Sequence, residues 1–60
     1  MDDYLIGIGK RIKDIRKSNK KTISTIANAA QVSNGLISRI ENGRTIPSLP
    51  VLLNIILNSV

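Results

Sequence analysis

The chain of 60 residues contains no cysteine and no histidine, and Tyr4 is its only aromatic residue. Without cysteine there is no disulfide framework, and without cysteine or histidine the usual zinc sites are excluded. A domain this short buries only about 60% of the surface that its unfolded chain exposes. The fold therefore has to rest on the packing of aliphatic side chains, with association with a partner subunit as a further source of stability.

Acidic residues are also scarce. Four carboxylates stand against nine Lys and Arg, which gives a formal net charge of +5. The carboxylates form no acid–base pair or metal cluster in the sequence, so we expect no catalytic residues, no cofactor and no metal site; they are Asp2, Asp3, Asp14 and Glu41. The positive charge predicts a polyanionic partner, with nucleic acid favoured over an acidic membrane surface.

The charge is distributed unevenly along the chain. Seven of the nine basic residues lie between Lys10 and Lys21, and no charged side chain follows Arg44. The basic stretch has a second interpretation as an ordinary solvated helix face. The acidic start Met1-Asp2-Asp3 is unlike a signal peptide, and the apolar stretches are too short to span a bilayer. We therefore expect a cytoplasmic protein that does not associate with membranes.

Apolar residues recur at helical spacing in four segments, without any extended strand-like alternation. The first apolar stripe consists of Ile8, Ile12 and Ile15. The segments predict helices over residues 5–18, 22–30, 33–41 and 48–58. The sequence thus predicts an all-α fold, a compact bundle of four short helices with five as the alternative, in a single domain over residues 1–60.

The two middle helices are short and are joined by about three residues. Thr22 and Ser33 are suitable N-cap residues for them. Such a short connection prevents antiparallel stacking and favours a steep crossing, which is the helix-turn-helix arrangement. Ala27 and Ala30 support this prediction, since two helices that cross closely need small side chains at the contact.

Three sequence strings carry a resemblance to a known family: TISTIANAAQVS at residues 22–33, SRIENG at residues 38–43 and PSL at residues 47–49. Together they resemble the Cro/C1-type (XRE) helix-turn-helix family, and the similarity extends over residues 8–57. The resemblance implies a lambda-repressor-like bundle in a DNA-binding transcriptional regulator. It also implies that the third helix enters the major groove of double-stranded DNA.

Site residues follow from the resemblance, position by position. It places at the base edges Ser33, Asn34, Gly35, Ser38 and Arg39. Among these, Asn34 suits the edge of adenine and Arg39 the edge of guanine. It places near the phosphates Thr22, Asn42, Arg44 and Thr45. Beside such a motif, Lys20 and Lys21 at the end of the basic stretch are also expected to approach phosphate. Arg16 and Glu41 occupy positions where the family often has an ion pair, which would fix the first helix against the third.

The chain also departs from the family pattern. Ile23 stands where glutamine often contacts a phosphate, and we expect Ile23 to pack against the core instead. Gln31 stands where glycine is usual, and a left-handed backbone there would cost roughly 1 kcal/mol. Lys21 replaces a usual apolar residue. Gly35 has no side chain to read a base, which indicates modest readout or a close approach of the backbone to DNA.

The last predicted helix is apolar around most of its circumference, and a 60-residue monomer cannot cover such a helix on all sides. We expect a homodimer through Leu49–Val60, or a further domain if the chain is the N-terminal part of a longer protein. An exposed apolar surface helix is the remaining interpretation.

The leading functional hypothesis is a repressor that binds a palindromic operator as a dimer. The alternative is a protein-interaction module, such as the antitoxin of a toxin–antitoxin pair with DNA autoregulation.

Overall fold

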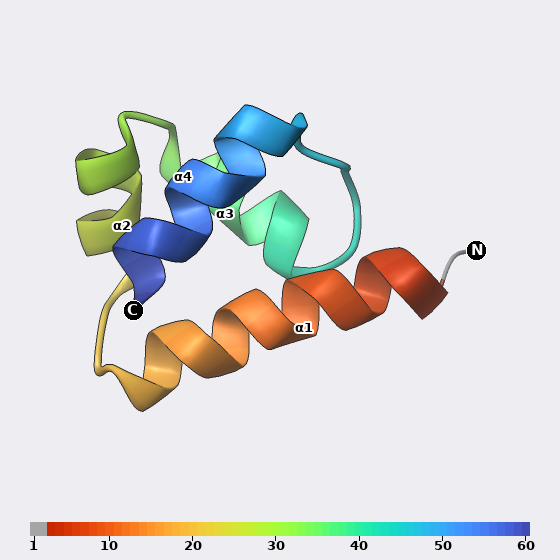
Figure 1. Ribbon diagram of the computed structural model, residues 1–60, viewed down its shortest axis with the longest axis horizontal. Coiled ribbons are helices and arrows are strands. Elements are labelled where there is room, and N and C mark those ends of the chain that lie inside the picture. The colour runs from red at the N-terminus through yellow and green to blue at the C-terminus, as the bar shows by residue number, and fades with distance from the viewer. Residues whose placement is uncertain (1–2) are drawn as a thin grey trace.

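A computed structural model describes the backbone of residues 3–60 and the side chains of residues 7–60. The expectations for Asp2 and Asp3 lie outside these described side chains. The described part of the chain forms four helices: α1 (Asp3–Ser18), α2 (Ile23–Ala30), α3 (Asn34–Glu41) and α4 (Leu49–Ser59). In Figure 1 the long helix α1 lies below the three shorter helices, and α4 crosses in front of α3. This arrangement confirms the predicted all-α helix-turn-helix bundle.

The core consists of isoleucine and alanine contributed by all four helices. Its buried members are Ile12, Ile26, Ala27, Ala30, Ile37, Ile40 and Ile55. Half-buried aliphatic side chains surround this centre, and Ile23 is among them. The inward packing of Ile23 confirms the expectation that this residue packs against the core. Burial of apolar surface is therefore the main source of stability in this aromatic-poor chain.

The first three helices end in the same way, with a left-handed residue after the last helical turn. These residues are Lys20 (φ 57°), Gln31 (φ 59°) and Gly43 (φ 69°). After α2, the Val32 amide donates to the Ala27 carbonyl at 2.9 Å, and the Gln31 amide donates to the Asn28 carbonyl at 3.3 Å. This pair of bonds defines a Schellman motif, in which glycine is the usual residue. Gln31 thus has the strained backbone that its sequence position predicted.

Gly9 allows α1 and α3 to approach closely. A Cβ atom at this position would collide with the Ile40 carbonyl oxygen and lie 2.9 Å from the Glu41 carbonyl oxygen. The sequence gives no indication of this contact, since glycine within a helix predicts only a local loss of stability. Any larger residue at position 9 would push α1 away from the end of α3.

An ion pair between Arg16 and Glu41 joins the same two helices. Arg16 Nε donates to Glu41 Oε2 at 2.7 Å, and Nη2 donates to Oε1 at 3.0 Å. A third bond runs from Arg16 Nη1 to the Lys21 carbonyl oxygen at 2.9 Å. The hydrogen bond with Glu41 raises the pKa of Arg16, and burial opposes this effect. The two-pronged geometry therefore fixes α1 against α3 in both position and rotation.

The C-terminal helix is attached to the remainder of the bundle through its asparagines and its last carbonyl groups. Asn54 Nδ2 donates to the Ala30 carbonyl oxygen at 2.9 Å, which satisfies the last turn of α2. Lys21 Nζ donates to the carbonyl oxygens of Asn58 at 3.1 Å and Val60 at 2.6 Å. A cation is favourable there because the carboxyl end of a helix carries partial negative charge. This attachment fixes α4 against both α2 and the α1–α2 loop.

Candidate nucleic-acid interface

Helices α2 and α3 pack against each other through the buried core. Ala27 and Ala30 of α2 are buried at 1% and 4% exposure, so small side chains let α2 pack closely against its neighbours. Each helix begins with a side-chain cap. Thr22 Oγ1 accepts from the Thr25 amide at 3.1 Å, and Ser33 Oγ accepts from the Leu36 amide at 3.0 Å. These caps set the start of both helices and satisfy amides that have no partner within the helix.

The outer edge of α3 carries polar side chains opposite its buried isoleucines. Asn34, Gly35 and Arg39 are exposed, and Ser38 is half-buried. These positions lie on one side of the helix, since residues three and four apart share a face. A Cβ atom on Gly35 would lie 3.4 Å from Arg39 Nη1. The guanidinium group of Arg39 therefore lies along the helix surface, over the position left open by Gly35.

A polar hollow of about 430 Å³ continues this edge past the end of α3. It is lined by Ser38, Arg39, Asn42 and Arg44. Asn42 Nδ2 donates to the Ser38 carbonyl oxygen at 2.8 Å, which holds the amide against the helix. Two guanidinium groups thus border one concave surface, which suits an anionic group such as phosphate.

The helix-turn-helix family of the Cro/C1 (XRE) type matches the chain over residues 12–56. The chain belongs to this family. The match covers all of α2 and α3, the second half of α1 from residue 12 on and most of α4, and it makes the chain a DNA-binding domain of the transcription-regulator type. A search of curated proteins and of solved structures found no match.

Other expected phosphate contacts of the family domain lie around the start of α2. Thr22 and Lys20 are exposed there, and the Thr22 hydroxyl also exchanges a hydrogen bond with Thr25 Oγ1 at 2.9 Å. Lys21 differs from this expectation, because its ammonium group is engaged by α4. A phosphate contact by Lys21 would require its ammonium group to leave the carbonyl oxygens of Asn58 and Val60. Past α3, Arg44 is exposed and Thr45 half-buried.

Ser24 is a polar contact of the interface that the sequence analysis missed. Its Oγ lies 3.2 Å from Asn34 Nδ2, so an exposed hydroxyl on α2 contacts the first residue of α3. The only sequence signal is a hydroxyl residue on the outer face of the second predicted helix. That signal cannot be distinguished from an ordinary solvated serine.

No group of three or more metal-ligating side chains comes together in residues 7–60. In the same part of the chain, no helix is long and apolar enough to cross a membrane.

Proposed function

We propose that this domain binds double-stranded DNA sequence-specifically, with α3 in the major groove and with binding rather than catalysis as its activity. The observation that carries the proposal is the exposed edge of Asn34, Gly35 and Arg39 on the side of α3 opposite its buried core residues. An asparagine amide matches the N6 and N7 edge of adenine, and a guanidinium group matches the O6 and N7 edge of guanine. Ser33 and Ser38 stand beside them as further polar contacts.

Phosphate contacts on both sides of α3 would hold the domain in register. Thr22 and Lys20 stand at the start of α2, and Asn42, Arg44 and Thr45 follow the end of α3. Such contacts position the protein without reading sequence. Each neutralised phosphate releases condensed counterions, so the affinity is expected to fall steeply as salt rises.

We further propose that the domain is a repressor that binds a palindromic operator as a homodimer. Helix α4 leaves one row of apolar side chains uncovered: Leu49 is 66% exposed, Leu53 52% and Leu57 71%. These residues are four apart and form a continuous ridge of the kind that packs into grooves of a facing helix. The nearby Ile46 and Val60 are 68% and 61% exposed, and they extend the apolar surface.

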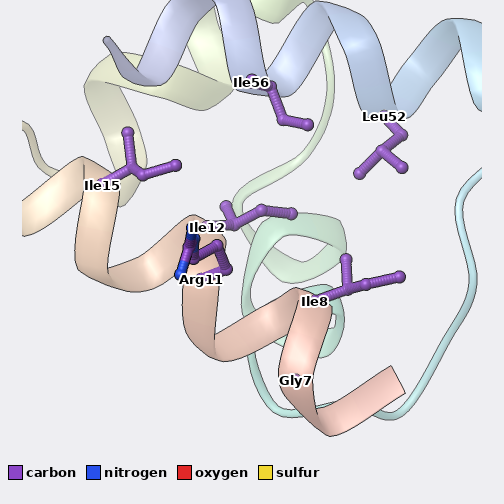
Figure 2. Close-up of a pocket in the computed structure, with 7 residues that line it drawn as sticks. All are labelled: Gly7, Ile8, Arg11, Ile12, Ile15, Leu52 and Ile56. Carbon is purple, nitrogen blue, oxygen red and sulfur yellow. The ribbon is translucent and has the colours of Figure 1, made fainter. Parts of the chain in front are cut away.

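An apolar groove of about 490 Å³ lies between α1 and α4. Figure 2 shows its two walls, with isoleucines of α1 facing aliphatic side chains of α4; the lining residues are Gly7, Ile8, Arg11, Ile12, Ile15, Leu52 and Ile56. A ridge and a groove that share helix α4 make the surface complementary to a second copy of itself, as a two-fold dimer requires. Because α4 carries no charged side chain, two copies with net charge +5 would meet where repulsion is weakest.

In vitro selection of bound duplexes from a random pool tests these proposals together. The expected result is an enriched palindrome whose half-sites are about 34 Å apart, or a multiple of that distance. Recovery of no preferred sequence would overturn the DNA-reading proposal. Recovery of a single half-site, with monomers at all protein concentrations, would overturn the dimer. A reporter gene placed downstream of the selected site tests repression, which predicts lower expression when the protein is present.

A second candidate function is a protein-interaction module such as an antitoxin. The exposed uncharged ridge of Leu49, Leu53 and Leu57 favours this function, because such a surface fits a different apolar partner as well as a second copy. Stable one-to-one co-purification with a different protein, together with displacement of the homodimer, would support the antitoxin-type role. A homodimer that persists in the presence of cell extract would count against it.

A further inference from the structure

The hydrogen bond between Ser24 and Asn34 joins the two helices of the motif on their outer side. Asn34 Nδ2 donates to Ser24 Oγ at 3.2 Å, across ten residues of sequence. Both side chains are exposed, so the bond is not a consequence of core packing. It lies at the amino end of α3, the end that enters the major groove in this type of motif. A side chain of α2 thus holds a side chain of the reading helix.

The chemistry of the Asn34 amide leaves room for both Ser24 and a base. An asparagine amide has two N–H donors and an oxygen that accepts. Recognition of adenine uses the oxygen and one N–H, which pair with the N6 and N7 positions. The second N–H is then available for the Ser24 hydroxyl. Ser24 therefore competes with no base contact and restricts the rotation of the amide before DNA arrives.

Ile23, the residue before Ser24, cannot form such a hydrogen bond with the Asn34 amide. Ile23 is half-buried against the core and has no polar group. Ser24 is the next residue along α2, and its hydroxyl reaches Asn34 from the exposed side. An exposed side chain loses rotational freedom on binding, and prior restraint of the side chain removes part of that loss.

We propose that Ser24 is a positioning residue that orients the Asn34 amide and so makes α3 prefer adenine at one operator position. The proposal rests on the proposed reading of DNA by α3. This positioning role is distinct from a structural role for Ser24, since removal of an exposed hydroxyl is expected to change the free energy of unfolding little. Its effect falls on the choice of base at one position and leaves phosphate-based affinity unchanged.

The test compares base preference for four proteins on the operator obtained by selection: the wild-type chain, Ser24→Ala, Asn34→Ala and the double variant. We expect the wild-type chain to favour adenine at one position by about tenfold, as one good amide–base pair allows. Ser24→Ala should reduce that preference to about threefold, with preferences at the other positions unchanged. In the Asn34→Ala background, Ser24→Ala should have no further effect, because the two residues act through one contact.

Two further variants separate positioning from a general effect. Ser24→Thr keeps a hydroxyl and should restore the adenine preference. Ser18→Ala removes an exposed hydroxyl at the end of α1 and should leave the preference unchanged.

The outcomes distinguish this inference from the proposed function. A wild-type chain without any preferred site means that DNA reading itself fails. A wild-type chain with a preferred site, but with the same adenine preference after Ser24→Ala, overturns only the role of Ser24. An equal loss of affinity on every sequence after Ser24→Ala also overturns it, because that result indicates a phosphate contact. A wild-type preference for guanine at the Asn34 position overturns it too, since guanine requires two donors.

Discussion

The outer edge of α3 and the outer face of α4 are both exposed, yet their chemistry is opposite. The α3 edge presents the amide of Asn34 and the guanidinium group of Arg39. The α4 face presents Leu49, Leu53 and Leu57, with no charged side chain anywhere on the helix. Exposure alone therefore does not indicate what kind of partner a surface of this small domain binds. The chemistry of the exposed groups distinguishes a surface suited to nucleic acid from one suited to a protein.

The inner faces of the same two helices are nearly indistinguishable. Ile37 on α3 and Ile55 on α4 are both fully buried in one core. Packing of aliphatic groups is non-directional and roughly proportional to the area removed from water. The core therefore holds both helices without specifying what either one contacts on its outer side.

The largest expected effect comes from the ion pair that supports both surfaces. Arg16→Met leaves the Glu41 carboxylate uncompensated with its side chain only 4% exposed, and this is expected to lower the free energy of unfolding by about 3–5 kcal/mol. Urea unfolding followed by circular dichroism measures the change. The double variant Arg16→Met with Glu41→Leu should recover most of the loss, because it removes both charges. If the single variant were as stable as the wild type, the pair would not hold α1 against α3.

The second-largest effect is expected from a substitution that alters the α4 surface alone. Leu53→Lys places a charge in the centre of the apolar ridge and is expected to weaken dimerisation by about 2–4 kcal/mol, as at an interface hot spot. Sedimentation equilibrium measures the dimer fraction. Ser18→Lys adds the same charge outside the ridge and should leave dimerisation unchanged. Equal dimer fractions for Leu53→Lys and the wild type would place the interface elsewhere.

A smaller effect is expected from a substitution that alters the α3 edge alone. Arg39→Ala is expected to weaken binding to the selected operator by about 1–3 kcal/mol and to relax the preference at one base position. Titration of fluorescent duplexes, with each base changed in turn, measures both quantities. Lys17→Ala, on the exposed side of α1, should leave the base preferences unchanged. Uniform weakening on all sequences by Arg39→Ala would assign Arg39 to phosphate instead.

The smallest effect concerns the turn that sets the angle between the two motif helices. Gln31→Gly relieves the left-handed strain at φ 59° and is expected to raise the free energy of unfolding by about 1 kcal/mol. In the turn after α3, Gly43→Ala places a Cβ atom on a backbone with φ 69° and should lower the free energy of unfolding by about the same amount. Thermal unfolding measures both. Ala29→Gly within α2 serves as a control, since glycine in a helix interior should destabilise by about 1 kcal/mol.

Much of the fold was predictable because its signals are local in the sequence. The spacing of apolar residues predicted four helices and an all-α bundle, and Thr22 and Ser33 marked the starts of the motif helices through their capping hydroxyls. The first helix was the least accurate, since it begins at Asp3 rather than at the predicted residue 5. Local helix propensity contains no information on the contact of Gly9 with α3.

Site residues whose chemistry depends on residue type were predictable from the sequence. Contacts between side chains of different helices were not predictable. Asn34 and Arg39 stood out because amide and guanidinium groups match base edges. The contact of Ser24 with Asn34 had no signal, since a hydroxyl on one helix reveals nothing about the direction of an amide on another. Lys21 was assigned to phosphate from its position alone, whereas the structure directs its ammonium group to the carboxyl end of α4.

The amino-acid sequence by itself determined the helices, the left-handed turn at Gln31 and the membership of a DNA-binding family, because these depend on short-range periodicity, capping and residue identity. Tertiary structure alone decided that Gly9 admits the end of α3 and that Ser24 holds Asn34. It also decided which leucines of α4 stay uncovered. These features depend on distances between helices, which are set by the packing of the whole core and are not encoded in any one segment.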